Sequence, residues 1–238
     1  MKKIRLIILF LAFMLSMQIP SYSVELEGNL NACTKVINTS KDIHEKENAY
    51  FYRGLYYFDN SDYDKAISDF TNSIKLAGND PFAQAESYSY RATSYMLKNN
   101  FNMAINDATK TLTIGYDRDA YEFVDWYLRA YYTRGISYYQ LKNYSKAISD
   151  FSSYIKEVGS VIQYYDFPQM ELLLANSYYL RVVSMIDSKT LPLNSRDGMI
   201  QVFGNLEAAI RIYSKLDGNK KVQAEELLKK LKAAYYNK

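Results

Sequence analysis

The fold of this chain is decided by a stretch that reads Thr133-Arg134-Gly135-Ile136-Ser137-Tyr138 and then Asn143-Tyr144-Ser145-Lys146-Ala147-Ile148-Ser149-Asp150-Phe151. Two earlier copies share its pattern. The first copy reads Tyr52-Arg53-Gly54-Leu55-Tyr56-Tyr57 and then Asp62-Tyr63-Asp64-Lys65-Ala66-Ile67-Ser68-Asp69-Phe70. The second copy reads Tyr90-Arg91-Ala92-Thr93-Ser94-Tyr95 and then Asn100-Phe101-Asn102-Met103-Ala104-Ile105-Asn106-Asp107-Ala108. In each copy the small residue of the first block precedes the alanine of the second by 12 positions. A constant offset of this kind indicates an internal repeat.

Each block predicts a helix, and each pair of blocks predicts a helical hairpin. Asp62, Asn100 and Asn143 stand where a side-chain oxygen can cap the second helix. The glycines that follow the second helix suit a left-handed terminating residue: Gly78, Gly115 and Gly159. One hairpin cannot bury both of its faces, so neighbouring hairpins must stack.

These residues resemble the tetratricopeptide repeat, with an aromatic residue, Gly or Ala, then Tyr on the first helix, and Ala then Phe on the second. Three copies are expected at about 47–80, 85–118 and 128–161, and the second has Ala108 in the Phe position. The family's late proline is missing from all three. The resemblance implies an all-α fold, a right-handed superhelix of stacked antiparallel helical hairpins.

The flanking segments predict degenerate units. Residues 24–46 should hold a half-repeat helix, with Cys33 in the aromatic position, followed by a polar linker, Lys41 to Asn48, that contains His44. Residues 162–218 predict a fourth hairpin whose helices are separated by an insertion that contains Pro192 and Gly198.

The last segment, 219–238, predicts an amphipathic helix that caps the array. Its apolar residues recur at helical spacing: Ala224, Leu227, Leu228, Leu231 and Tyr235.

Residues 1–23 predict a signal peptide. Lys2, Lys3 and Arg5 precede an apolar run from Leu6 to Met17, and small residues allow a cut before Val24. The run is shorter than the roughly 20 residues that span a bilayer, and an uncleaved anchor is the alternative. We therefore expect an exported protein, periplasmic or secreted, whose only membrane contact would come through an uncleaved signal segment.

Charge argues against a nucleic-acid partner. The chain has 29 Lys+Arg and 26 Asp+Glu, and three basic but no acidic residues lie before Val24. The mature chain therefore has equal numbers of each, without the clustered positive charge that nucleic acids require.

Catalysis has little support in this sequence. His44 is the one histidine and Cys33 the one cysteine, too few for a zinc site with three or four protein ligands. No phosphate-binding glycine loop or nucleophile motif is present. Leu30 to Cys33 is superficially similar to a lipoprotein signal, but Glu25 and Glu27 separate it from the apolar run, so a buried structural thiol is expected. We predict no enzymatic activity, no cofactor, no bound metal and no small-molecule substrate.

Arginine and aspartate recur together in the three clear copies. Arg53, Arg91 and Arg134 precede the small residue of each first helix, and Asp69, Asp107 and Asp150 recur on the second. Either they pair between helices as a partly buried ladder, or duplication of one unit repeats them without contact. In the predicted fourth unit both places are apolar, Leu174 and Ile212.

The resemblance implies a concave surface, lined by the first helices, at which partners bind. The predicted binding residues are Phe51, Leu55, Phe58, Met96, Tyr132, Ile136, Tyr139 and Tyr179, with Ser89, Thr93, Leu172 and Asn176 completing the set. Phe51 and Leu55 replace the Lys and Asn by which one subgroup of the family clamps carboxylates.

An apolar, aromatic groove of this kind favours an extended or helical peptide with hydrophobic anchors. We therefore predict a protein-binding scaffold. The alternative is a self-associating subunit whose groove is covered by the 219–236 helix or by another copy. Trp126 either adds an aromatic rim or, as we favour, packs against the preceding helix.

Overall fold

A computed structural model describes residues 23–115, 124–161, 168–192 and 195–236 of the chain. Within these ranges there are ten α-helices and no β-strands. The predicted signal peptide, apart from Ser23, lies outside the described residues. The chain divides into two compact units, 1–133 and 134–238, with the boundary inside one helix.

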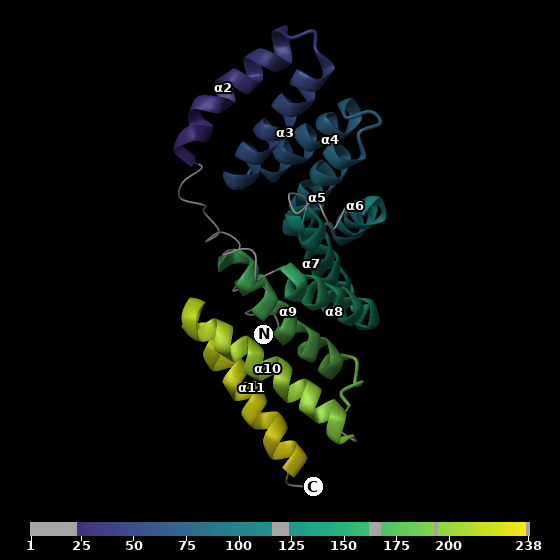
Figure 1. The fold of residues 1–238 in the computed structure, drawn as a ribbon, viewed down its shortest axis with the longest axis vertical. Helices are drawn as coiled ribbons and strands as arrows, with labels where there is room; N and C mark the ends of the chain where they lie inside the picture. The colour runs from purple at the N-terminus through teal and green to yellow at the C-terminus, as the bar shows by residue number, and fades with distance from the viewer. Residues whose placement is uncertain (1–22, 116–123, 162–167, 193–194, 237–238) are drawn as a thin grey trace. The chain divides into compact units, whose positions relative to one another are not determined.

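The first unit is a series of helices in which each packs against the next. Its helices are α2 (Ser23–Thr39), α3 (Ile43–Asp59), α4 (Tyr63–Leu76), α5 (Pro81–Leu97), α6 (Phe101–Ile114) and the first part of α7 (Val124–Gln140). Helix α2 packs on α3, α3 on α4, α4 on α5 and α5 on α6 (Figure 1). The prediction of an all-α fold built from stacked hairpins is confirmed.

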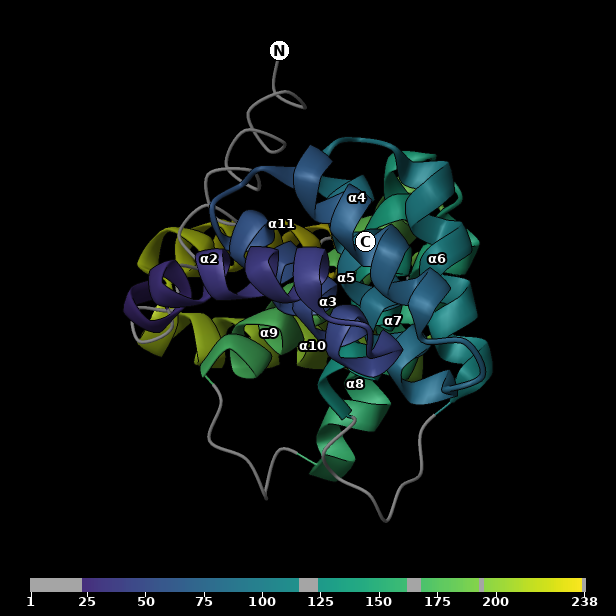
Figure 2. The same ribbon diagram turned by 90° about the horizontal axis from the view of Figure 1, so that it is seen from above.

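The second unit continues the same alternation. After the remainder of α7 come α8 (Tyr144–Val161), α9 (Pro168–Asp187), α10 (Arg196–Leu216) and α11 (Gly218–Tyr236). Helices α9, α10 and α11 lie side by side in this order (Figures 1 and 2). The first helices of the four hairpins are thus α3, α5, α7 and α9, and the second helices are α4, α6, α8 and α10.

All four hairpins turn in the same way after the first helix. One residue in the turn adopts a left-handed conformation, and the next N–H donates to a carbonyl of the first helix five residues back. The left-handed residues are Ser61, Asn99, Lys142 and Lys189, with φ between 59° and 61°. The accepting carbonyls belong to Tyr57, Tyr95, Tyr138 and Met185, at N···O distances of 2.8–3.0 Å. This shared turn identifies α9 and α10 as a hairpin equivalent to the other three.

The small residues are required because the paired helices approach closely. A Cβ atom added to Gly54 would lie 2.8 Å from Cε1 of Phe70, and one added to Gly135 would lie 3.0 Å from the same atom of Phe151. The middle hairpin has a small residue on each helix instead, with Ala92 in a cluster with Ala108 and Ala130.

Most predicted helix ends are correct, and two are not. Asp62 and Asn143 cap their helices, but the Asn100 side chain makes no capping hydrogen bond. Gly78 and Gly115 have positive φ at helix ends, whereas Gly159 lies inside α8, which continues to Val161.

Two predicted irregular segments are also helical. The expected linker around His44 is the first part of α3, because Asp42 accepts hydrogen bonds from the backbone N–H groups of His44 and Glu45 at 2.7 and 3.3 Å. Gly198, expected in the insertion, lies in the first turn of α10, where the hydroxyl of Ser195 accepts from its N–H at 3.0 Å. The insertion therefore shrinks to the segment between Asp187 and Arg196.

Candidate functional site

The repeated arginines and aspartates form the predicted ladder. In each rung the guanidinium meets both carboxylate oxygens of the aspartate 16 residues later. The Nε–Oδ2 distances are 2.7 Å for Arg53–Asp69, 2.6 Å for Arg91–Asp107 and 2.8 Å for Arg134–Asp150. Such paired, planar contacts are strong and directional. The alternative of duplication without contact is wrong.

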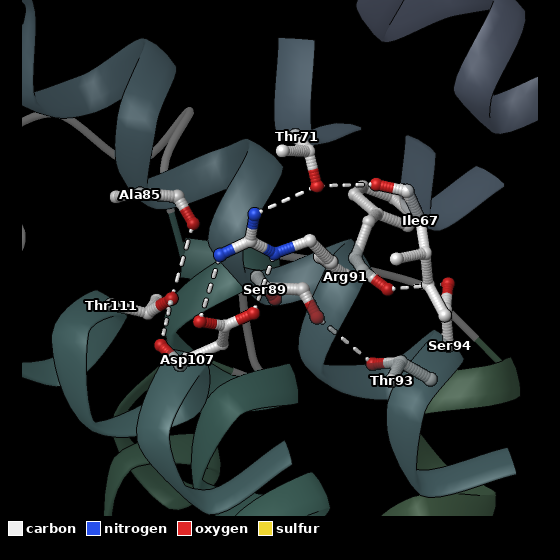
Figure 3. A network of polar contacts seen from close by, with 10 residues as sticks. Ile67, Thr71, Ala85, Ser89, Arg91, Thr93, Ser94, Asp107 and Thr111 are labelled. Carbon is white, nitrogen blue, oxygen red and sulfur yellow. Dashed lines mark hydrogen bonds and ion pairs between the residues drawn. The ribbon is translucent and has the colours of Figure 1, made fainter. Parts of the chain in front are cut away.

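Both ladder arginines of the first unit, Arg53 and Arg91, also contact the helix that precedes their own hairpin. The Nη1 group of Arg91 donates to the hydroxyl of Thr71 on α4 at 2.9 Å (Figure 3). The Nη1 group of Arg53 donates in the same way to Thr34 on α2 at 3.2 Å. One guanidinium therefore joins three helices, and the ladder stabilises the stacking as well as each hairpin.

The fourth hairpin has a rung that the sequence did not predict, because apolar residues were expected at both places. Arg181 donates from Nη1 to the hydroxyl of Ser152 on α8 at 3.2 Å and from Nη2 to Oδ1 of Asn205 on α10 at 2.5 Å. The rung is thus Arg181–Asn205 and not the apolar pair Leu174 and Ile212. An amide replaces the carboxylate in this rung. Arg181 is therefore a cation that is only 9% exposed and whose hydrogen-bond partners, Ser152 and Asn205, are neutral.

The predicted binding residues of the first unit divide into buried and half-buried groups. Phe51, Met96 and Tyr132 are 7%, 3% and 3% exposed, so they support the surface from beneath. Leu55 and Phe58 are half-buried beside the cluster of Phe51, Ala66 and Phe70. Only these last two of the five can touch a partner without rearrangement.

Helix α5 is covered by the first part of α7 at the predicted binding residues Ser89 and Thr93. The Ser89 hydroxyl donates to the carbonyl oxygen of Trp126 at 2.9 Å, and the Thr93 and Thr133 hydroxyls lie 3.1 Å apart. Trp126 itself is 4% exposed, which confirms that it packs inside rather than forming a rim.

Tyr90 is the centre of an aromatic group that the sequence prediction missed. Its ring lies 5.7–5.8 Å from the rings of Phe51, Phe58 and Phe70. The guanidinium carbon of Arg129 lies 4.4 Å from the centroid of the Tyr90 ring, within the range of a cation–π contact. Hairpins one and two therefore share an aromatic core that ends at Arg129.

Carboxylates surround this aromatic group. Asp125 accepts from Arg129 at 2.6 Å. Burial, and then the charges of Asp125 and Glu47, raise the pKa of Glu86 to about 7. Burial also raises the pKa of Asp59, against the opposite effect of Arg129. We call Leu55, Phe58, Tyr90, Glu86 and Arg129 the first-helix face of unit 1.

In the second unit Tyr139 on α7 and Tyr179 on α9 are half-buried, whereas Ile136 on α7 is buried. Ile136 is 3% exposed. The Tyr139 hydroxyl donates to Oδ2 of Asp187 at 2.9 Å, and burial followed by this contact raises the pKa of Tyr139. Tyr179 packs against the same apolar cluster as Leu227 of α11.

The end of the array covers the remaining predicted positions on α9. Asn176 is 4% exposed, and its Oδ1 accepts from the Tyr213 hydroxyl at 2.8 Å and from Nζ of Lys220 at 3.1 Å. Leu172 packs against the cluster that includes Ala224 of α11. Helix α11 therefore covers part of this hairpin.

Within the described ranges the structure contains no group of three His, Cys, Asp or Glu side chains that could hold a metal ion. Cys33 is half-buried rather than buried, and burial raises its thiol pKa. Among the same residues, no helix is both long and apolar enough to cross a membrane.

Comparison with known proteins matches this geometry. Family models of the tetratricopeptide repeat match residues 47–80 and 128–156. These two segments of the chain are tetratricopeptide repeats. Proteins with these repeats are generally non-enzymatic scaffolds that bind other proteins.

A solved structure of similar fold is that of BtubC (BKLC) from P. vanneervenii. It is 14% identical, with a TM-score of 0.51, and the match covers 94% of this chain and 93% of that chain. At this identity the likeness concerns the fold alone. No match was found among curated proteins.

Proposed function

We propose that this protein is an exported scaffold that holds a protein or peptide on the first-helix face of unit 1. One observation carries the proposal. Glu86 is half-buried near the like charges of Asp125 and Glu47 and makes no hydrogen bond or ion pair within the described ranges. A carboxylate with a strongly raised pKa costs stability and marks a candidate functional site.

The chemistry of this face favours a particular partner. Leu55 and Phe58 can accept an apolar anchor, and Glu86, Asp59 and Asp125 outnumber the single nearby cation, Arg129. A basic side chain next to an apolar one would pair with Glu86 and satisfy it. The partner we propose is therefore a peptide segment that carries a hydrophobic anchor beside Lys or Arg.

Export is the second part of the proposal. It is supported by the basic start, the apolar run and the small residues before Val24. Cleavage there would leave a mature chain that begins one residue into α2. The scaffold would then work in the periplasm or outside the cell.

The alternative function is a self-associating structural subunit. Its support is the coverage of α9 by α11, in which Lys220 binds the buried Asn176. Such coverage affects the fourth hairpin and leaves Leu55, Phe58 and Glu86 unaffected.

A pull-down tests the scaffold. The chain from Val24 is immobilised and incubated with envelope and supernatant fractions, and captured proteins are identified by mass spectrometry. We expect Phe58→Ala combined with Leu55→Ala to weaken capture while helicity is nearly unchanged, because both side chains are half-buried on this face. Met103→Ala is the matched control, because Met103 is 38% exposed on the second helix α6. Undiminished capture by the double variant would refute the proposed face.

A further inference from the structure

Helix α11 occupies the positions of the fourth hairpin at which a partner was predicted to bind. These positions are Leu172, Asn176 and Tyr179. Nζ of Lys220 donates to Oδ1 of Asn176 at 3.1 Å, and Leu172 and Tyr179 pack against the two apolar clusters to which α11 contributes. We call Leu172, Asn176 and Tyr179, with the apolar side chains of these clusters on α9 and α10, the covered surface. Its occupant in this structure is a helix of the same chain.

Helix α11 is held by few buried contacts. Ala224 is its one buried residue, and the other apolar side chains that it packs on the hairpin are half-buried: Leu227, Leu228, Leu231 and Tyr235. The neighbouring helix α10 buries seven residues: Met199, Val202, Phe203, Asn205, Leu206, Ala209 and Tyr213. Because an element with few buried apolar contacts opens at a lower free-energy cost than the rest of its domain, α11 should open before α9 and α10 separate.

The polar contact at the start of α11 opposes closure. The side chain of Lys220 is 19% exposed, and burial lowers its pKa to about 8 despite the attraction of Asp217. A lowered lysine pKa means that the charged form is destabilised in the closed position. Beside it, Nδ2 of Asn176 is a buried donor without a hydrogen-bond partner among the described residues, which also costs stability. Opening of α11 would return both groups to water.

A single residue connects α11 to the hairpin. Asp217, with an extended backbone at φ −154° and ψ 92°, lies between Leu216 at the end of α10 and Gly218 at the start of α11. From there α11 runs back along α10 (Figure 1), and the ring centroids of Tyr235 and Phe203 are 6.1 Å apart. A few residues at the end of an element are enough to act as a hinge. A change in the torsion angles of Asp217 and Gly218 would therefore move α11 away while α9 and α10 stay paired.

Helix α11 also shows which kind of segment the covered surface accepts. Its contact residues recur on one side at helical spacing: Ala224, Leu227, Leu228, Leu231 and Tyr235. An amphipathic helix laid on an apolar surface is a common mode of peptide recognition. Lys220 fits poorly, because Oδ1 of Asn176 already accepts from the Tyr213 hydroxyl at 2.8 Å while Nδ2 needs an acceptor. A neutral amide in the place of Lys220 would supply that acceptor without burying a charge.

We propose that α11 is a detachable cover, which opens as one unit about Asp217 and Gly218 and exposes the covered surface to an amphipathic helix of a partner protein. The partner helix carries the apolar pattern of α11 and an amide side chain in the place of Lys220. A segment joined by a short connection has an effective local concentration of the order of 1 mM, so α11 excludes weaker ligands. The covered surface shares no residue with the first-helix face of unit 1, and either proposal can fail without the other.

Hydrogen exchange of the chain from Val24, followed by mass spectrometry, tests the opening without any variant. The backbone amides of α11 should exchange together and about tenfold or more faster than those of α9 and α10. Lys220→Gln should slow the exchange of α11 by roughly tenfold, because the neutral amide removes the cost that lowers the lysine pKa. Lys229→Gln is the matched control: it makes the same change on the exposed side of α11 and should leave the rate unchanged. Equal exchange in all three helices would overturn the proposal.

A fluorescent peptide of residues 218–236 tests the partner chemistry by anisotropy. The chain that carries Leu228→Asp and Leu231→Asp should have an open cover, because both side chains pack on the hairpin. We expect the peptide to bind this variant saturably and the wild type about tenfold or more weakly. A peptide with Lys220→Gln should bind the variant roughly tenfold more tightly, and a peptide with both aspartates should not bind.

Two results would contradict the cover. The first is a variant that retains the circular dichroism of the other helices and yet does not bind the native peptide. The second is a wild type that binds the peptide as tightly as the variant does. The exchange measurement uses the folded wild type, so it decides whether α11 opens even where the double variant does not fold.

Discussion

Replacing Asn205 by Asp should stabilise the protein. In the fourth rung Nε of Arg181 and Nδ2 of Asn205 are both buried donors without a hydrogen-bond partner in the structure. Exchanging Nδ2 of Asn205 for a carboxylate oxygen gives Nε of Arg181 an acceptor. It also removes Nδ2, the second donor without a partner. It also supplies the negative charge that the other three rungs have. The change alters no volume, so packing around the rung should be preserved.

The expected gain follows from competing contributions. Each orphaned buried donor costs about 1–3 kcal/mol, and a hydrogen bond to a charged group contributes about 1.5–3 kcal/mol. Burial of the new carboxylate opposes this by several kcal/mol, as the raised pKa of Asp150 in the neighbouring rung illustrates. We expect a net increase in the free energy of unfolding of about 1–3 kcal/mol.

Urea denaturation followed by circular dichroism at neutral pH measures this increase as a higher midpoint with an unchanged slope. The matched variant is Asp150→Asn, which gives the third rung the composition of the fourth and should lower the free energy of unfolding by about 2–3 kcal/mol. An Asn205→Asp variant that is less stable than the wild type would show that burial of the carboxylate outweighs pairing, and the ladder argument would fail.

Three further predictions concern other features. Gly54→Ala should lower the free energy of unfolding by about 1–3 kcal/mol in urea melts, because the added Cβ meets the ring of Phe70. Since the folded pKa of Glu86 is raised from 4.5 to about 7, the wild type should lose stability as pH rises from 4.5 to 7. Glu86→Gln should match it in acid and exceed it above pH 7 by at most about 3 kcal/mol in thermal melts. Amino-terminal sequencing of the exported protein should begin at Val24, and a retained Met1 would contradict the signal peptide.

Local patterns predicted the hairpins well because they depend on contacts within one unit. The offset from Gly54 to Ala66 is set by a three-residue turn that recurs in the second and third hairpins. The fourth hairpin starts its longer connection with the same left-handed residue and hydrogen bond. The binding residues were predicted less well, since their exposure depends on the neighbouring units. Met96 and Ile136 lie on first helices as expected, yet both are 3% exposed because adjacent helices pack over them. The sequence of one repeat does not by itself show where the neighbouring repeats lie.

The fourth rung shows that spacing within one helix stays a reliable sequence pattern where an insertion separates the two helices of a hairpin. The arginine and its partner are 16 residues apart in three hairpins but 24 apart in the fourth, so an alignment that depends on the second block fails there. Within one helix the spacing cannot change: a tyrosine stands three residues before every ladder arginine, at Tyr50, Tyr88, Tyr131 and Tyr178. In the first two hairpins the guanidinium carbon lies 5.5 and 5.3 Å from the centroid of this ring, a cation–π contact that helical geometry preserves. Tyr178 therefore identifies Arg181 as the fourth rung, where the spacing between helices misleads.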